Sequence, residues 1–131
     1  MPTCSTQVRV RYAETDQMQV VYHANYFVWF EVGRCELLRS LGQSYRDLEA
    51  TGVQLPVIDA HCEYRRSAHY DDDLTVVTQG RLLSPARVRF EYEVHRSADG
   101  VVTAVGSTEH AAVNVQGRPT RLPVHIQEML V

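Results

Sequence analysis

The stretch NYFVWFEVGRCELLRSLG, residues 25–42, carries an apolar pattern with the period of a helix. One glycine and several large apolar residues recur in steps of four and three, which brings them onto a single helical face. They are Tyr26, Phe30, Gly33, Leu37 and Leu41. Leu41-Gly42 supplies a stop signal. The pattern predicts a helix from about Asn25 to Leu41 that buries this face.

Gly33 lies in the middle of this predicted helix, where glycine costs about 1 kcal/mol relative to alanine. A residue that weakens the helix there indicates that another part of the chain packs very close to the helix backbone. The face of a β-sheet is a good candidate.

The regions before and after the helix alternate apolar and polar residues, as half-buried β-strands do. One such run precedes the helix and four follow it: Gln7–Tyr12, Val57–Arg65, Leu74–Leu83, Arg87–Arg96 and Val101–Val115. The segments that join the later runs are short and rich in turn residues. The sequence therefore predicts five strands, joined mostly as antiparallel hairpins.

Two shorter helical segments accompany these strands. Ser44–Gly52 is typical of a short helix with Ser44 as its N-terminal cap and Gly52 at its end. The last residues, 124–131, fit either one or two helical turns or a frayed end. One long helix and one sheet can each bury an apolar face only if the sheet curls around the helix. We therefore expect residues 1–131 to form a single α+β domain, and its edge strands favour assembly into oligomers.

Composition excludes several classes of function. The 16 acidic residues exceed the 13 Lys+Arg, the formal net charge is −3 and there is no basic block, so the charge distribution of a nucleic-acid-binding protein is missing. Three cysteines without metal-binding spacing predict free thiols in a reduced, cytoplasmic protein. No segment resembles an export signal or approaches the ~20 apolar residues that cross a bilayer, and we expect no membrane insertion.

The segment RVRYAETDQMQVVYHANYFVWFE, residues 9–31, resembles the opening of hotdog-fold acyl-CoA thioesterases of the 4-hydroxybenzoyl-CoA thioesterase and YbgC type. These proteins carry an Asp in a T-D-x-x-G-x-V-Y-x-x-x-Y setting before a central helix. Thr15-Asp16, Val21-Tyr22, His23 and Tyr26 match this setting, and AHYDDDLTVVT, residues 68–78, resembles the family's entry into the third strand. The resemblance implies a hotdog fold, in which a five-stranded antiparallel sheet wraps a long helix, and a homotetramer built from two dimers.

The resemblance also implies hydrolysis of an acyl-CoA thioester. Asp16 would act as general base or as nucleophile, with Tyr12 assisting, and the backbone N–H at His23 would polarise the thioester carbonyl at the positive end of the helix. Gln19 stands where the family commonly has glycine, and Ser67 where it commonly has proline. We expect Gln19, in place of this glycine, to change the shape of the loop that lies beside the acyl thioester and so to affect the choice of substrate.

Each catalytic assignment has a structural alternative. Asp16 could be a turn or cap residue, the His23 ring could only bond the backbone, and Tyr12 could be a core residue on its strand. The protein as a whole could instead bind acyl-CoA or acyl carrier protein without catalysis, or be a hotdog hydratase or dehydratase.

CoA would enter as part of the substrate, and we expect no separate cofactor. Arg65, Arg66 and Arg87 are candidate contacts for its phosphates, with ordinary surface arginines as the alternative, and Tyr22 is a candidate for lining the acyl pocket. Three adjacent carboxylates, Asp71-Asp72-Asp73, are more typical of a solvated turn than of a calcium loop. The histidines lack zinc-ligand spacing, and we expect no metal.

Overall fold

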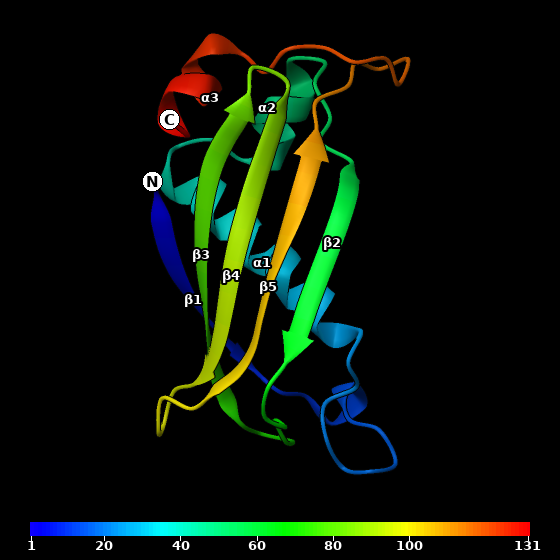
Figure 1. Cartoon of the computed structure of the whole chain (residues 1–131), viewed down its shortest axis with the longest axis vertical. Coiled ribbons are helices and arrows are strands. Elements are labelled where there is room, and N and C mark those ends of the chain that lie inside the picture. Colours follow the sequence, from blue (N-terminus) through cyan, green and yellow to red (C-terminus); the bar gives the residue numbers. More distant parts are fainter.

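A computed structural model describes all residues, 1–131, and shows one antiparallel five-stranded sheet wrapped around a long helix (Figure 1). The strands follow the order β1-β3-β4-β5-β2 across the sheet. Their bounds are β1 Thr3–Arg9, β2 Val57–Tyr64, β3 Asp73–Ser84, β4 Arg87–Arg96 and β5 Val102–Ala111. The helices are α1 Asn25–Ser40, α2 Tyr45–Ala50 and α3 Val124–Met129. No helix of the chain is long and apolar enough to cross a membrane.

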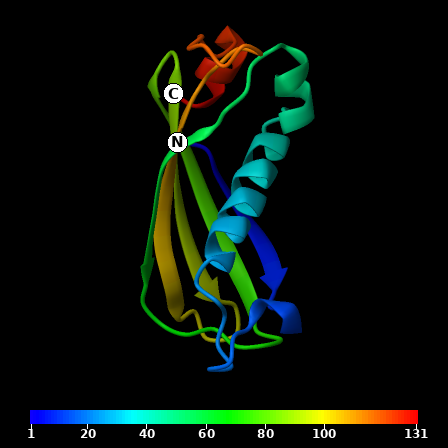
Figure 2. The same ribbon diagram turned by 90° about the vertical axis from the view of Figure 1, so that its right-hand side faces the viewer.

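The long helix α1 lies across one face of the sheet, mainly over β1 and β3 (Figure 2). Its buried face includes Tyr26, Phe30 and Leu37, as the spacing predicts. Phe30 is completely buried and stacks on the ring of Tyr92 in β4, with ring centroids 4.2 Å apart. The predicted wrap of an antiparallel sheet around the Asn25–Leu41 segment is therefore confirmed.

The element boundaries show where tertiary contacts override the local pattern. The first strand is Thr3–Arg9 rather than Gln7–Tyr12, because the chain turns at Arg11 into a 3₁₀ turn, Tyr12–Glu14. The prediction for the end of this strand was therefore wrong. The short helix α2 does carry the predicted cap, since the Ser44 hydroxyl accepts the Asp47 N–H at 3.1 Å. Residues 124–129 form the helix α3, so the frayed-end alternative was wrong.

Gly33 packs directly against the sheet, as its position in the helix predicts. A methyl group added there would lie 3.0 Å from Cγ1 of Val76 and closer still to Oγ1 of Thr78. Gly33→Ala should therefore destabilise the protein by about 1–3 kcal/mol through overpacking, although alanine is the better helix former. Urea unfolding measures this change, with Ser40→Ala on the exposed face of the same helix as the control. A stability equal to or above that of the wild type would contradict the close packing.

Strand β2 forms the edge of the sheet that α1 does not cover. It pairs only with β5, and its residues are mostly exposed, including Val57 at 46%, Ile58 at 47% and Tyr64 at 46%. An exposed apolar edge strand is open to pairing with another chain.

Candidate functional site

The loop between β1 and α1 carries the predicted catalytic residues and lies at the opposite end of the sheet from α2 and α3 (Figure 1). Within it, a small hairpin is formed by bridge pairing of Thr15 with Val21. The Asp16 N–H donates to the Val20 carbonyl at 2.9 Å, and the Gln19 N–H donates to the Asp16 carbonyl at 2.9 Å. Asp16 therefore opens a tight, hydrogen-bonded turn.

The carboxylate of Asp16 is partly exposed, and its two oxygens are used differently. Oδ1 accepts the Met18 N–H at 2.8 Å, which stabilises the turn, whereas Oδ2 accepts no hydrogen bond from the chain. The turn and catalytic interpretations of Asp16 are thus compatible. One oxygen holds the loop and the other is free to act on a ligand.

The N-terminus of α1 has unpaired backbone donors beside this turn. Ala24 is the N-cap residue and provides no side-chain cap. The Tyr22 N–H donates to the Glu14 carbonyl at 2.9 Å and the Asn25 N–H donates to the Tyr22 carbonyl at 3.0 Å. The N–H groups of His23 and Ala24 donate to no acceptor in the chain. Two free donors therefore stand at the positive end of a 16-residue helix.

Asp16 and His23 line the same open cleft of about 310 Å³. Sequence reasoning placed Arg65 and Arg66 near the substrate, and both line this cleft as well. Tyr22 is absent from the lining and instead packs its ring against that of His23, with centroids 4.5 Å apart.

Tyr64, the last residue of β2, is a site residue that the sequence analysis missed. Its hydroxyl donates to the His23 carbonyl at 3.0 Å, and its ring contacts that of Tyr26 edge-on at 5.4 Å. Loss of solvation raises the pKa of Tyr64 to about 12, so the phenol stays protonated and remains a donor at neutral pH. Its position just before Arg65-Arg66 was the available signal, but only the fold brings β2 to the start of α1.

Asp16 also lines a second cleft, of about 580 Å³, together with Tyr12, Gln19 and His69 among others. Tyr12 is 78% exposed and contacts Tyr70 edge-on, with centroids 5.5 Å apart. The alternative that Tyr12 is a core residue was therefore wrong, because the strand ends before it. Gln19 has φ +65°, the left-handed region in which glycine is favoured.

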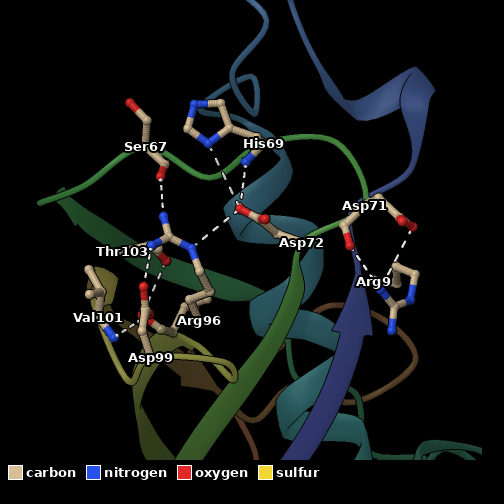
Figure 3. A network of polar contacts seen from close by, with 10 residues as sticks. Arg9, Ser67, His69, Asp71, Asp72, Arg96, Asp99, Val101 and Thr103 are labelled. Atoms are coloured by element: carbon tan, nitrogen blue, oxygen red, sulfur yellow. Dashed lines mark hydrogen bonds and ion pairs between the residues drawn. The ribbon is translucent and has the colours of Figure 1, made fainter.

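Polar contacts, including ion pairs, stabilise the loop after β2, which begins with Arg65 and Arg66 (Figure 3). Arg96 of β4 donates to the carbonyl of Ser67 at 3.1 Å and to Asp99 at 2.9 Å, and it also pairs with Asp72 at 3.5 Å. The carbonyl of Ala68 in turn accepts the Val21 N–H at 2.8 Å. This loop is therefore joined to the hairpin that carries Asp16.

The acidic triplet takes part in the same network. Asp72 accepts the His69 N–H at 2.9 Å, and Asp71 is exposed and pairs with Arg9 at 3.7 Å. Asp71 and Asp72 thus lie in a turn and form ion pairs, whereas Asp73 begins β3. The chain brings no group of three metal-ligating side chains together.

Arg87 does not belong to this site in the single chain. It is the first residue of β4 and pairs with Ala111, the last residue of β5, at the end of the sheet near α2 and α3 (Figure 1). Strands β2 and β4 are both antiparallel to β5 and therefore run in the same direction. Arg65 and Arg66 follow the end of β2 whereas Arg87 begins β4, so one chain places them at opposite ends of the sheet. The prediction that groups Arg87 with Arg65 and Arg66 is therefore not met within one chain.

Comparison with known proteins gives consistent matches. The sequence model described as the thioesterase-like superfamily matches residues 10–130. YneP of Bacillus subtilis, named as a candidate acyl-CoA thioesterase, is 38% identical over 114 residues, which are 87% of this chain and 82% of YneP. YbgC of Escherichia coli O157:H7, named an acyl-CoA thioester hydrolase, is 40% identical over 72 residues, which are 55% of this chain and 54% of YbgC.

A solved structure extends the likeness to the whole fold. The DHNA-CoA thioesterase of Staphylococcus aureus superposes with a TM-score of 0.90 at 35% identity, covering 98% of this chain and 87% of that protein. The hotdog fold implied by the sequence resemblance is thereby confirmed.

Proposed function

The chain belongs to the thioesterase-like superfamily, and from this premise we propose that it is an enzyme that hydrolyses an acyl-CoA thioester to a free acid and CoA. One observation carries the proposal: a carboxylate oxygen without a partner, on Asp16, shares a cleft with a helix start whose first N–H groups are also without partners. These are the two groups that thioester hydrolysis requires, a base or nucleophile and a site for the developing oxyanion.

The chemistry follows from this arrangement. The Asp16 carboxylate takes a proton from a water molecule that attacks the carbonyl carbon, or it attacks that carbon itself and forms an anhydride that water then opens. In either route the carbonyl oxygen becomes negative and accepts hydrogen bonds from the free N–H groups at the start of α1. The C–S bond breaks, the CoA sulfur leaves and is protonated, and the acyl group leaves as a carboxylic acid.

Arg65 and Arg66 would contact the phosphates of CoA at the edge of the same cleft. The roles of Tyr22 in the acyl pocket, of Tyr12 in assisting Asp16 and of Arg87 in contacting CoA remain proposals. The direct test is the release of free thiol from a panel of aromatic, short-chain and long-chain acyl-CoAs by the purified protein. Hydrolysis of at least one class supports the proposal. Tight binding without hydrolysis of any would favour a non-catalytic acyl-CoA or acyl-carrier-protein binding protein, and addition of water to an enoyl-CoA would favour a hydratase.

Two variants of His23 separate its side chain from its backbone. His23→Ala removes the ring and keeps the N–H, so we expect only a modest loss of activity. His23→Pro removes the N–H as well. Proline is favoured at the first central position of a type I turn, and His23 occupies this position in the turn closed by the hydrogen bond from Asn25 to Tyr22. His23→Pro should therefore hydrolyse the best substrate about 10²- to 10³-fold more slowly than His23→Ala.

Circular dichroism and thermal melting of both His23 variants provide the control that the start of α1 is intact. Equal rates for the two variants would show that the His23 N–H does not polarise the carbonyl.

We also propose that the protein assembles as a homotetramer, a dimer of dimers in which sheets continue across an interface. The exposed apolar edge of β2 supports this, with Ile58 47% exposed, as does Val28 on α1, 52% exposed. Sedimentation velocity at micromolar concentration should show the assembly, and Ile58→Lys should weaken it because a charged edge resists pairing. A stable wild-type monomer would contradict the proposal.

A further inference from the structure

Glu14 is the one buried carboxylate of the chain, with 5% of its surface exposed. Its Oε1 accepts the Arg11 N–H at 2.7 Å, and its Oε2 accepts the indole N–H of Trp29 at 3.2 Å. The Arg11 guanidinium lies beside it, with 3.4 Å between Nε and Oε1. Both oxygens are therefore engaged, one by the turn before the hairpin and the other by the second turn of α1.

The backbone of Glu14 makes a second set of contacts with the same elements. Its carbonyl oxygen accepts the Tyr22 N–H at 2.9 Å and the Asn25 side-chain N–H at 2.9 Å. Tyr22 ends the hairpin and Asn25 begins α1. Glu14 thus forms hydrogen bonds with three segments: the turn before the hairpin, the end of the hairpin and the start of α1.

These contacts define the geometry of the proposed site. Asp16 follows Glu14 by two residues, on the hairpin, whereas the free N–H groups of His23 and Ala24 belong to the start of the helix. We infer that Glu14 is a positioning residue that sets the placement of the Asp16 carboxylate relative to these donors. The inference rests on the proposed function of the site.

Glu14 acts through its neighbours and not on the substrate. It is buried and lines neither of the two clefts that meet at Asp16. Misplacement of a reacting group by 1 Å can cost about 10²-fold in rate, so a residue that fixes this distance should affect kcat more than KM.

Glu14→Gln is the matched variant, because it keeps the size of the side chain but replaces one accepting oxygen with an NH₂ group. The Arg11 and Trp29 N–H groups donate to different oxygens of Glu14, so in the variant one of them faces an NH₂ group that can only donate. We expect kcat for the best acyl-CoA to fall by about 10- to 100-fold with KM little changed. Asn25→Ala removes only the side-chain hydrogen bond to the Glu14 carbonyl, so it should also lower kcat, but by less. This variant tests the inference if Glu14→Gln does not fold.

A double-mutant cycle with Asp16→Asn separates positioning from general support of the fold. If Glu14 acts by placing the Asp16 carboxylate, Glu14→Gln should hardly change the residual kcat of Asp16→Asn. Ile126→Val, a core change in α3 at the far end of the molecule, is the control for lost stability and should leave kcat unchanged.

Two results would overturn the inference: wild-type kcat in Glu14→Gln and Asn25→Ala, or the same fractional loss from Glu14→Gln with and without Asp16. Failure of the proposed function gives a different result, because the wild type would then hydrolyse no acyl-CoA of the panel, or Asp16→Asn alone would be fully active.

Discussion

Asp16→Asn should lower kcat for thioester hydrolysis by about 10²- to 10⁴-fold while the protein keeps its fold. Asparagine has nearly the same size and retains an oxygen that can accept the Met18 N–H. In the wild-type protein this N–H donates to Oδ1 of Asp16 at 2.8 Å. The hairpin turn should therefore survive. What is lost is the negative charge on the oxygen that has no partner, and with it the ability to deprotonate water or attack the thioester. The loss should exceed that of His23→Ala, which leaves the backbone donor in place.

Asp71→Asn supplies a matched control for this result. It makes the same chemical change in a neighbouring loop, at an exposed residue with φ +68°, a conformation that asparagine tolerates. We expect its kcat to equal that of the wild type. Near-wild-type hydrolysis by Asp16→Asn, measured by thiol release on the best substrate of the panel, would show that the proposed site is wrong.

The second large effect concerns stability, which should fall as the pH is lowered from about 6.5 to 4 because of His110. This residue is completely buried. Its Nδ1 lies 2.9 Å from the Leu55 carbonyl, which can only accept, so Nδ1 carries the proton. Nε2 of the neutral ring then accepts from the Thr108 hydroxyl at 2.9 Å, and Thr108 accepts from Tyr92 at 2.7 Å. This directional chain leaves no acceptor for a second ring proton.

Burial, opposed by the bond to Leu55 and assisted by the nearby charge of Arg34, lowers the pKa of His110 from 6.5 to about 4. In the unfolded chain the ring keeps its ordinary pKa. Between these two values the unfolded state binds a proton that the native state does not, so stability is fully present above pH 6.5 and is lost as the pH falls. The difference amounts to about 3 kcal/mol.

Urea unfolding at a series of pH values measures this effect, and the NMR titration of the His110 ring gives its pKa directly. His110→Gln should be less stable at neutral pH but should have a shallower decline between pH 6.5 and 4. The same slope in both proteins, or a ring that titrates near 6.5, would contradict the prediction.

Local residue patterns were sufficient where an element depends on its own sequence. The helix α1 was predicted from apolar spacing, and Gly33 indicated close packing because a helix does not otherwise favour glycine. The strand Arg87–Arg96 was predicted with the bounds that the structure has, because regular alternation of apolar and polar residues indicates a half-buried strand. The likeness of residues 9–31 to one family identified Asp16 and the start of the helix as candidates for one site.

Contacts between distant segments were beyond the reach of these patterns. Nothing near Tyr64 in the sequence shows that its hydroxyl bonds the carbonyl of His23, 41 residues away. The three arginines were treated as equivalent because each lies near a strand end. Only the strand order shows that Arg65 and Arg66 reach the cleft, whereas Arg87 lies at the other end of the sheet.

By itself, the sequence determined the long helix, the strands that wrap it and the family motif, because apolar period and residue identity are properties of short segments. The tertiary structure alone decided where β1 ends, which side chains surround Asp16 and that Glu14 joins the hairpin to the helix. These depend on hydrogen bonds whose partners are distant in the chain, such as those from Tyr22 and Trp29 to Glu14. The buried Glu14 carboxylate has both oxygens paired, whereas the partly exposed Asp16 carboxylate has one free oxygen. This difference arises only when the chain folds.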